Sequence, residues 1–317
     1  FFLVLYNRMK YYIRIICKSG YKYKDNSGNK LNSQKLIDQF NKLYIVPIYK
    51  QTKFYNTKEK IYASSIDSKG RTQYSYNQEF KEEREKKKLK QLKHFLKIQS
   101  SLERKINSDL EQSKNIKNKL IASILKLMKI CNFRIGNDNY EKEYGSIGLT
   151  TLKSKHIKFK NDITLISFNR KKGVLNDCTL KNKKMQSILK SLSNNNKKYL
   201  FSYKSVNNNL RHITNNDVNE YLEVFEITNK DIRMSNANFL FMHFFNIHTK
   251  NIHFLELNEK EQKKIIKACA EKVAHYLHNT VNVALNSYIS KELIEKVKKI
   301  KVKSNLNVNA QIKKLIT

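Results

Sequence analysis

Arginine is rare in this chain compared with lysine, so the few arginines are the first candidates for residues with a specific chemical role. Of the 63 basic residues only nine are arginine, so lysine is used wherever a simple positive charge is enough. A guanidinium group is a planar fork that binds two oxygens of a phosphate or carboxylate together, which an ammonium group cannot do. Arg71, Arg134 and Arg233 stand inside conspicuous motifs and are therefore candidate ligands of an oxyanion.

Arg134 is expected to leave the end of a buried helix. Apolar residues recur at helical spacing from Ile116 to Cys131, just before this arginine. The stretch that it opens is rich in glycine for a chain that has only seven. Because glycine reaches backbone conformations closed to other residues, we expect such conformations at Gly70, Gly136, Gly145, Gly148 and Gly173.

Lys171 is expected on a mobile hairpin. Three short strand-like runs follow Arg134, separated by turn residues: His156–Lys160, Ile163–Phe168 and Val174–Leu180. The first turn is Asn161-Asp162 and the second is the polar run 169–173, with Lys171 at its tip.

The composition indicates a polyanionic partner. The formal net charge is +36, from 63 Lys and Arg against 27 Asp and Glu, and nucleic acid is the usual ligand of such an excess. The codon bias of an AT-rich genome also raises Lys, Asn, Ile and Tyr, but it does not explain why acidic residues are scarce. Hydrophobic residues make up 40% of the chain, which is enough for a packed core and excludes a disordered basic tail.

Residues 1–80 are expected to form a β-rich domain. Alternation at Tyr21–Lys24 before an Asp25–Gly28 turn predicts a hairpin, and a short helix is expected at 33–43. Two more strand-like pieces flank Asp67–Gly70, and the second interleaves basic residues with Gln and Tyr. Such a strand suits DNA, because cations meet phosphates while amides and rings reach base edges.

A charged helical run at 81–98 is expected to link this domain to a second one at 99–317. The pattern of the second domain is mainly helical, with helices predicted at 216–225 and 265–278 around the three strands. The predicted fold class is therefore α+β, a small β-rich N-terminal domain followed by a mainly α-helical domain with a three-stranded sheet.

The cysteines and histidines indicate neither a disulfide framework nor a metal site. The four cysteines, at 17, 131, 178 and 269, lie far apart without a CxxC pattern, which fits a reducing compartment. His275 and His278 share one helix, but a metal site needs more ligands at defined spacing, and a supporting or solvated role is favoured for His278. The opening FFLVLY is too short for a signal peptide or a membrane span, and Met9 is a candidate initiator.

Taken in order, the motifs resemble those of the type IB DNA topoisomerases, in the subfamily of poxviruses, giant viruses and bacteria. An element of the family's N-terminal domain is matched by Ser68-Lys69-Gly70-Arg71-Thr72-Gln73-Tyr74-Ser75-Tyr76. Motifs of its catalytic domain are matched by Arg134, Gly136, Tyr140, Gly145, Gly148–Ile157, Lys230-Asp231-Ile232-Arg233 and Leu277–Tyr288. The resemblance extends over residues 19–292.

The resemblance implies a mechanism as well as a fold of the tyrosine recombinase and topoisomerase IB type. Tyr288 is the expected nucleophile, and its 3′-phosphotyrosyl link to DNA would conserve bond energy, so that resealing needs no ATP, metal or other cofactor. Arg134, Arg233 and Asn279 would stabilise the pentacoordinate transition state, and Lys171 would protonate the leaving 5′-oxygen. Rotation about the intact strand would then relax supercoils. DNA contacts are expected from Lys69, Arg71, Gln73, Tyr74, Tyr76 and Tyr140.

The position of the general acid departs most from the family pattern. Arg170 replaces the usual Gly before Lys171, and Lys172 follows directly, so the spacing from Phe168 alone selects Lys171 over Lys172.

Two other functions remain alternatives. A tyrosine recombinase shares the same chemistry, but it carries His-x-x-Arg where this chain has Lys230-x-x-Arg233. A non-catalytic, basic DNA-packaging protein is the alternative from another class, and the unusual Arg170 and Val281 give it some weight. The resemblance implies a monomer that binds double-stranded DNA inside the cell and no membrane, and for a viral protein a place in a cytoplasmic virus factory or the virion.

Overall fold

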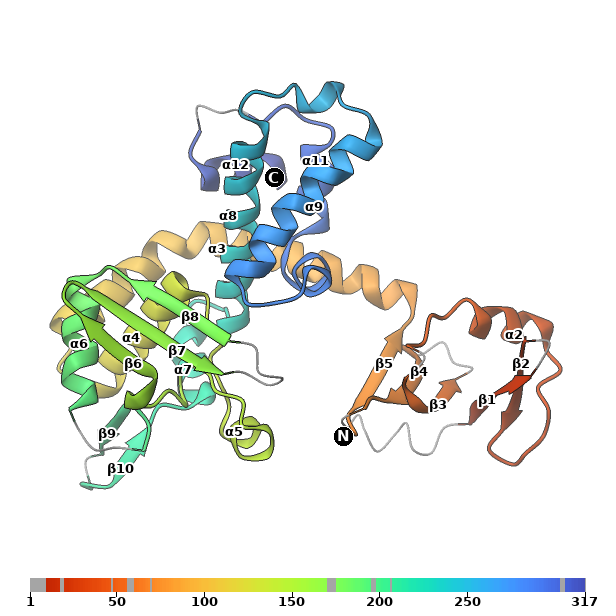
Figure 1. Cartoon of the computed structure of the whole chain (residues 1–317), viewed down its shortest axis with the longest axis horizontal. Coiled ribbons are helices and arrows are strands. Elements are labelled where there is room, and N and C mark those ends of the chain that lie inside the picture. Colours follow the sequence, from red (N-terminus) through yellow and green to blue (C-terminus); the bar gives the residue numbers. More distant parts are fainter. Residues whose placement is uncertain are drawn as a thin grey trace. The chain divides into compact units, whose positions relative to one another are not determined.

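The computed structural model describes residues 10–17, 20–46, 48–55, 60–68, 70–169, 175–194, 198–205, 207–302 and 306–316. The expected general acid Lys171, its neighbour Lys172 and the expected DNA contact Lys69 lie outside these ranges. The chain divides into two compact units, residues 1–87 and 88–317 (Figure 1).

The first unit is built on a five-stranded antiparallel sheet of order β2-β1-β3-β4-β5. Its elements are β1 (Tyr11–Cys17), β2 (Gly20–Asp25), α2 (Gln34–Asn41), β3 (Lys50–Tyr55), β4 (Ile61–Ile66) and β5 (Thr72–Tyr76). Tyr23, Phe40 and Phe54 fill its core, with ring centroids 5.1–5.3 Å apart. The predicted β-rich character is confirmed, and so are the helix near 33–43 and the strand pair around 67–70.

The turn predicted at Asp25–Gly28 is present, but the returning strand of the predicted hairpin is reduced to a short antiparallel bridge. Strand β2 pairs with β1, which precedes it, and beyond the turn a single bridge joins Lys24 to Lys30. The carboxylate of Asp25 accepts hydrogen bonds from the backbone N–H groups of Ser27 and Asn29, at 3.0 and 2.9 Å. This closed turn leads into α2 rather than into another strand, and a local turn signal cannot distinguish the two outcomes.

Helix α3 is longer than expected. It spans Gln78–Gln112, in place of the helix predicted at 81–98, and it continues from the first unit into the second. Charged residues obscure its apolar face in the sequence, but Leu92, Phe95, Leu102 and Ile106 are all buried. The later part of α3 is therefore part of the core of the second unit.

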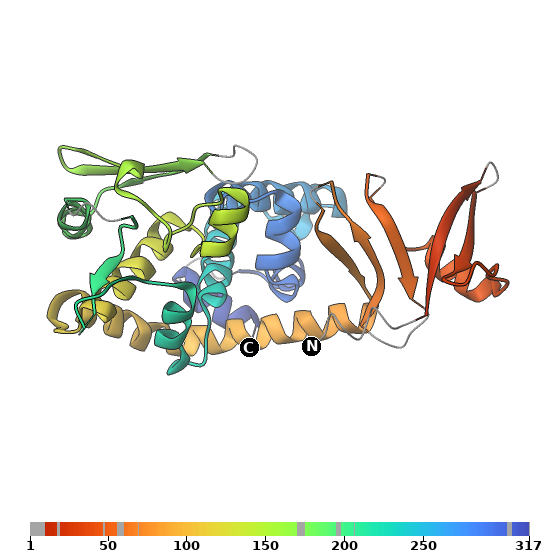
Figure 2. The same ribbon diagram turned by 90° about the horizontal axis from the view of Figure 1, so that it is seen from below.

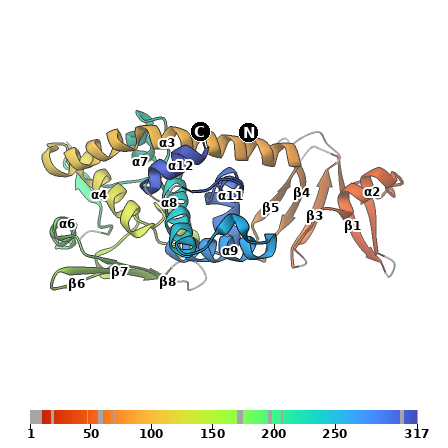
Figure 3. The ribbon, with the colours of Figure 1, turned by 90° about the horizontal axis from the view of Figure 1, so that it is seen from above.

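The second unit combines a small sheet with a bundle of helices. The sheet consists of β6 (Ile157–Lys160), β7 (Ile163–Asn169) and β8 (Leu175–Leu180). The first elements of the unit besides the sheet are α4 (Ile116–Cys131), α5 (Asp138–Tyr144), η1 (Ser154–His156), α6 (Lys183–Ser193), β9 (Ser202–Lys204), β10 (Leu210–His212) and α7 (Asn215–Glu223). The rest are α8 (Asn229–Thr249), η3 (Phe254–Glu256), α9 (Glu259–Tyr276), α10 (Val281–Val283), the π-helix η4 (Ala284–Tyr288), α11 (Lys291–Val297) and α12 (Val308–Ile316). Figures 2 and 3 show α4 between the sheet and the later part of α3.

The three-stranded sheet is confirmed nearly to the residue. Strands β6, β7 and β8 pair antiparallel in that order, and Asn161 turns the first hairpin with a φ of 42°. The helix α4 also has the predicted bounds. A second, two-stranded sheet of β9 and β10 was not predicted, because strands of three residues are too short to show a pattern.

Two hydrophobic clusters make up the interior of the second unit, and α8 borders both. One cluster surrounds α4 and includes Phe133, Phe168 and Ile232. The other surrounds α9 and includes Met234 and Ala237. Neighbouring residues of α8 therefore belong to different clusters, which makes this helix the joint between the sheet side and the helical side.

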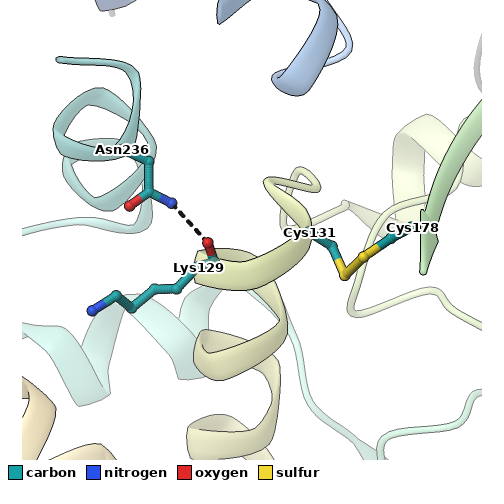
Figure 4. Close-up of a disulfide and its surroundings, with 4 residues drawn as sticks. All are labelled: Lys129, Cys131, Cys178 and Asn236. Atoms are coloured by element: carbon teal, nitrogen blue, oxygen red, sulfur yellow. Dashed lines mark hydrogen bonds between the residues drawn. A yellow bond between two sulfur atoms is a disulfide. The ribbon is translucent and has the colours of Figure 1, made fainter. Parts of the chain in front are cut away.

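The expected absence of a disulfide is wrong, because Cys131 and Cys178 are bonded (Figure 4). Cys131 is the last residue of α4, and Cys178 lies on β8, opposite Ile166 of β7. Forty-seven residues separate the two cysteines, so only the pairing of helix and sheet brings them together. The bond fastens the end of the helix before Arg134 to the strand that follows the Lys171 turn. The expectation of a reducing compartment therefore loses its basis in the cysteine pattern.

Within the described ranges, no helix is long and apolar enough to cross a membrane. The same part of the chain contains no group of three or more His, Cys, Asp and Glu side chains arranged as ligands of a metal ion.

We expect the disulfide to stabilise the second unit measurably. Closing a loop of this length stabilises a fold by about 2–4 kcal/mol, since it restricts the unfolded chain. Cys131→Ser and Cys178→Ser should each lower the free energy of unfolding by such an amount, and the double variant should lose no more than either alone. Cys17→Ser is the control, because Cys17 is a free cysteine. Equal melting temperatures with and without reductant would contradict the pairing.

Candidate active site

Arg134 lies on the surface directly after a buried helix end. Helix α4 stops at Asn132, whose left-handed backbone (φ 54°) turns the chain, and Phe133 is then buried beneath the site. Arg134 is exposed, and its Nη2 donates a 2.6 Å hydrogen bond to Oδ1 of Asn279, 145 residues later. The structure thus brings together two residues that the sequence analysis placed in one site.

Two backbone segments, residues 134–136 and 148–150, cross in close contact and fix the position of the Arg134 backbone. The carbonyl of Arg134 accepts from the N–H of Leu149 at 3.0 Å, and that of Ile135 accepts from the N–H of Thr150 at 2.7 Å. A Cβ added to Gly148 would lie 2.4 Å from the Cα of Gly136, so the two segments touch only because Gly148 has no side chain. Gly136 has the unusual backbone conformation that was expected, with a φ of 99°. Gly148 is required for a different reason, because a side chain at this position would collide with the Gly136 backbone.

Arg233 is the buried counterpart of Arg134. It lies on α8 and is 3% exposed. Its Nη1 donates to the carbonyl of Asn132, and its Nη2 donates to the carbonyl of Leu277 at 3.0 Å. Burial lowers the pKa of this guanidinium, and the nearby Tyr288 opposes that shift. A lysine has no such fork and could not hold two carbonyls in these directions.

Tyr288 ends the π-helix η4 and lies beside this guanidinium. The wide turn is closed by a 2.9 Å hydrogen bond from the N–H of Ile289 to the carbonyl of Ala284. The tyrosine is half-buried, and the Arg233 guanidinium carbon lies 5.3 Å from its ring centroid. Burial would raise the pKa of Tyr288, but the positive charges of Arg233 and Arg134 outweigh it, and the pKa falls below its ordinary value. The phenolate is therefore easier to form here than in water.

Asn238 holds the backbone that directly follows the tyrosine side chain. It is fully buried on α8, where its Nδ2 donates to the carbonyl of Tyr288 at 3.0 Å and its Oδ1 accepts from the N–H of Ser290 at 2.8 Å. Buried amides keep their hydrogen bonds because an unpaired one is costly. The sequence analysis missed this residue, although a lone Asn in the apolar run 237–242 was a usable signal.

The turn after α9 supplies Asn279. The chain reverses at His278, which has a φ of 51°, and the N–H of Asn279 donates to the carbonyl of Ala274 at 2.8 Å. The ring of His278 packs on that of Phe133, 5.4 Å between centroids, and burial lowers its pKa. His278 is thus a packing residue beneath the site, consistent with the supporting role that was favoured.

Two buried donors at this site have no protein partner of ordinary geometry. They are the Nε of Arg233 and the Nδ2 of Asn279, and neither has a well-aligned hydrogen-bond acceptor in the described part of the chain, although the Arg233 guanidinium also interacts with the Tyr288 hydroxyl. Unsatisfied buried donors are rare in folded proteins. Two of them beside Arg134 and a tyrosine with a lowered pKa make an arrangement that is able to hold an anion.

Tyr140 lies on the short helix α5, which polar contacts tie to its surroundings. No residue of α5 is buried. Glu141 accepts from the hydroxyl of Tyr199 and pairs with Lys153, both at 2.6 Å, and Asp138 pairs with His212 at 2.9 Å. Tyr140 itself is 55% exposed and is available to a ligand.

Of the expected DNA contacts of the first unit, Gln73, Tyr74 and Tyr76 lie on β5, an edge strand, and Arg71 directly precedes it. Both Nε and Nη2 of Arg71 donate to Asp67, at 2.8 and 2.6 Å, and the Gln73 amide also donates to Asp67 at 3.1 Å. Tyr74 and Tyr76 are half-buried neighbours, 6.4 Å between ring centroids. Asp67, which the sequence analysis did not single out, thus orients two of the expected contacts.

Comparison with known proteins gives an independent result. A family model described as the catalytic core of eukaryotic DNA topoisomerase I matches residues 77–315. A DNA topoisomerase 1B of Acanthamoeba polyphaga mimivirus is 29% identical over 88% of this chain and 85% of its own length. A DNA topoisomerase 1B of vaccinia virus is 27% identical over 80% of this chain and 77% of its own length. A monkeypox virus DNA topoisomerase I is 26% identical over the same shares.

We expect Gly148→Ala to damage the site through its backbone. The new methyl group would also lie 2.9 Å from the carbonyl oxygen of Arg134, so the segment carrying this arginine must move. Displacing a ligand by about 1 Å can slow a reaction roughly a hundredfold. The rate of covalent DNA capture should therefore fall at least tenfold. Gly28→Ala is the control, since Gly28 has a positive φ of 88° and open space around it. Similar capture rates for the two variants would refute the crossing as the cause.

Proposed function

The chain belongs to the type IB DNA topoisomerase family, and we propose that Tyr288 is the nucleophile of its strand-cleaving site, with Arg134, Arg233 and Asn279 as transition-state ligands. The activity is that of this family, an ATP-independent relaxation of supercoiled DNA. One observation carries the residue assignment. Two arginines and an amide from three distant segments converge beside one tyrosine among the 18 in the chain.

The proposed cleavage step begins with the phenolate oxygen of Tyr288, whose proton is given up to solvent, attacking the phosphorus of one strand. A bond forms between this oxygen and phosphorus, the bond from phosphorus to the 5′-oxygen breaks, and a 3′-phosphotyrosyl link remains. Negative charge on the non-bridging oxygens grows in the transition state, and preorganised donors stabilise it. The free N–H groups of Arg233 and Asn279 and the exposed fork of Arg134 are the donors we assign to these oxygens.

The leaving 5′-oxygen needs a proton, and we assign its transfer to Lys171. Strands β7 and β8, which flank residues 170–174 in the sequence, are paired up to Asn169 and Leu175. Resealing is the reverse reaction, in which the 5′-hydroxyl attacks the phosphotyrosyl bond and returns the proton to the lysine. Between these steps, rotation about the intact strand releases supercoils.

DNA binding is assigned to both units. We propose that Lys69, Arg71, Gln73, Tyr74 and Tyr76 contact DNA in the first unit and Tyr140 in the second, supported by the net charge of +36. The protein is proposed to act as a monomer on double-stranded DNA inside an infected cell, in the virus factory or the virion, since the similar proteins named above are viral. A purely DNA-packaging role is the weaker alternative, because such a protein does not need a buried, hydrogen-bonded site. A recombinase is also the weaker alternative, because this chain has Lys230-x-x-Arg233 in place of His-x-x-Arg.

Tyr288→Phe should abolish relaxation. The phenyl ring retains the packing but has no oxygen to attack phosphorus, so supercoiled plasmid should stay supercoiled, with EDTA present and ATP absent, while the wild-type protein relaxes it. Covalent capture of DNA should vanish, and non-covalent affinity should change little because phosphate contacts dominate it. Tyr276→Phe, on the exposed side of α9, is the matched control and should relax plasmid normally. Relaxation by the Tyr288→Phe variant would overturn the assignment.

Lys171→Ala should be slow on ordinary DNA and close to wild type on DNA with a 5′-bridging sulfur. Sulfur is a far better leaving atom than oxygen, so the reaction no longer needs an acid. The adjacent lysine is the control, because successive residues of an extended hairpin point to opposite faces. Lys172→Ala should therefore be mildly affected on both substrates. Rescue of Lys172→Ala by sulfur, instead of Lys171→Ala, would move the acid by one residue.

A further inference from the structure

The turn at Asn132 connects the two arginines of the site. Its backbone N–H closes α4 by donating to the carbonyl of Met128 at 3.0 Å, and its left-handed conformation directs the chain toward Arg134 two residues later. Its own carbonyl accepts the hydrogen bond from Nη1 of Arg233. Any movement of this turn therefore changes the position of one arginine through the chain and of the other through a hydrogen bond.

Asn236 holds this turn from α8. It lies one helical turn after Arg233 and so on the same face of the helix. The Nδ2 group of Asn236 donates to the side-chain oxygen of Asn132 at 3.0 Å and to the carbonyl of Lys129 at 3.3 Å. Both of its hydrogens are thus used on the last turn of α4. Figure 4 shows the contact of Asn236 with the Lys129 carbonyl and, at Cys131, the disulfide.

The two contacts from α8 act on different atoms of one residue. Arg233 binds the backbone oxygen of Asn132, whereas Asn236 binds its side-chain oxygen. An asparagine tolerates the left-handed conformation, and its side chain here has a defined partner, so the direction of its carbonyl is determined. Because two Arg233 donors are already committed, to Asn132 and Leu277, the direction of the remaining Nε depends on where those carbonyls lie.

We propose that Asn236 is a positioning residue, which through Asn132 fixes the Arg233 guanidinium relative to Arg134 and Tyr288. The proposal rests on the proposed function, since it concerns the same site. Asn236 touches no reacting atom, and it is half-buried, so its removal opens no cavity in either hydrophobic cluster. Its effect should therefore be on the rate of the chemical step and not on folding.

The test compares rates of covalent DNA capture at saturating protein, DNA affinity and melting temperature. Asn236→Ala should capture DNA roughly ten- to a hundredfold more slowly, as expected for a displaced ligand, with affinity unchanged. Asn132→Gly keeps the left-handed turn and the carbonyl but removes the oxygen that Asn236 binds. It should reproduce the slow rate, and combining it with Asn236→Ala should add nothing.

Asn246→Ala is the matched control on the same helix. Asn246 is also half-buried and donates to Gln311 at 2.7 Å, far from the site, so its loss should leave the capture rate unchanged. Arg233→Ala and the double variant Arg233→Ala/Asn236→Ala complete the set. If Asn236 acts through Arg233, the double variant should be no slower than Arg233→Ala alone.

Each outcome has a distinct meaning. Wild-type capture by Asn236→Ala together with slow capture by Arg233→Ala would overturn the positioning role and leave the site intact. Wild-type capture by Arg233→Ala would overturn the proposed site itself. Equal slowing of Asn236→Ala and Asn246→Ala, with equal loss of melting temperature, would show a general loosening of α8 and overturn the proposal as well.

Discussion

A buried guanidinium is the constraint on which the rest of the site depends. Removing a charge from water is expensive unless hydrogen bonds replace the lost hydration. Arg233 meets this requirement with two main-chain carbonyls, at Asn132 and Leu277. These carbonyls belong to the residues that cap the C-terminal ends of α4 and α9, so the fold must bring the ends of both helices to one arginine. The two hydrophobic clusters of the second unit meet at the same helix, which explains why the site lies there.

The parts of the site are set by backbone contacts made from packed elements. The Gly136–Gly148 crossing fixes the segment of Arg134, and Asn238 fixes the π-helix end that carries Tyr288. None of these contacts is large in energy, since a hydrogen bond contributes about 0.5–1.5 kcal/mol net. Together they define directions, and catalysis depends on direction more than on total stability.

Sequence patterns predicted the helices and strands better than they predicted the tertiary contacts between them. The helix before Arg134 and the three-strand sheet follow from apolar spacing and turn residues, which are local properties. The Cys131–Cys178 bond and the partners of Asn236 depend on tertiary contacts that no local pattern records. The true length of α3 was missed because charged residues mask its narrow apolar face. The motif resemblance placed Arg134, Arg233, Asn279 and Tyr288 in one proposed site, and they lie near one another in the structure. The amides that contact the surrounding backbone were not in the motifs.

Helix α5 has a consequence for how salt acts on this protein. A helix without a buried residue has a low free energy of local opening, and here ion pairs such as Glu141–Lys153 oppose that opening. Added ions screen such pairs when they are partly exposed. With Tyr140 among the proposed DNA contacts, ionic strength acts on the protein surface as well as on the counterions of DNA. The logarithm of DNA affinity would then fall with the logarithm of salt concentration more steeply than the number of neutralised phosphates alone predicts.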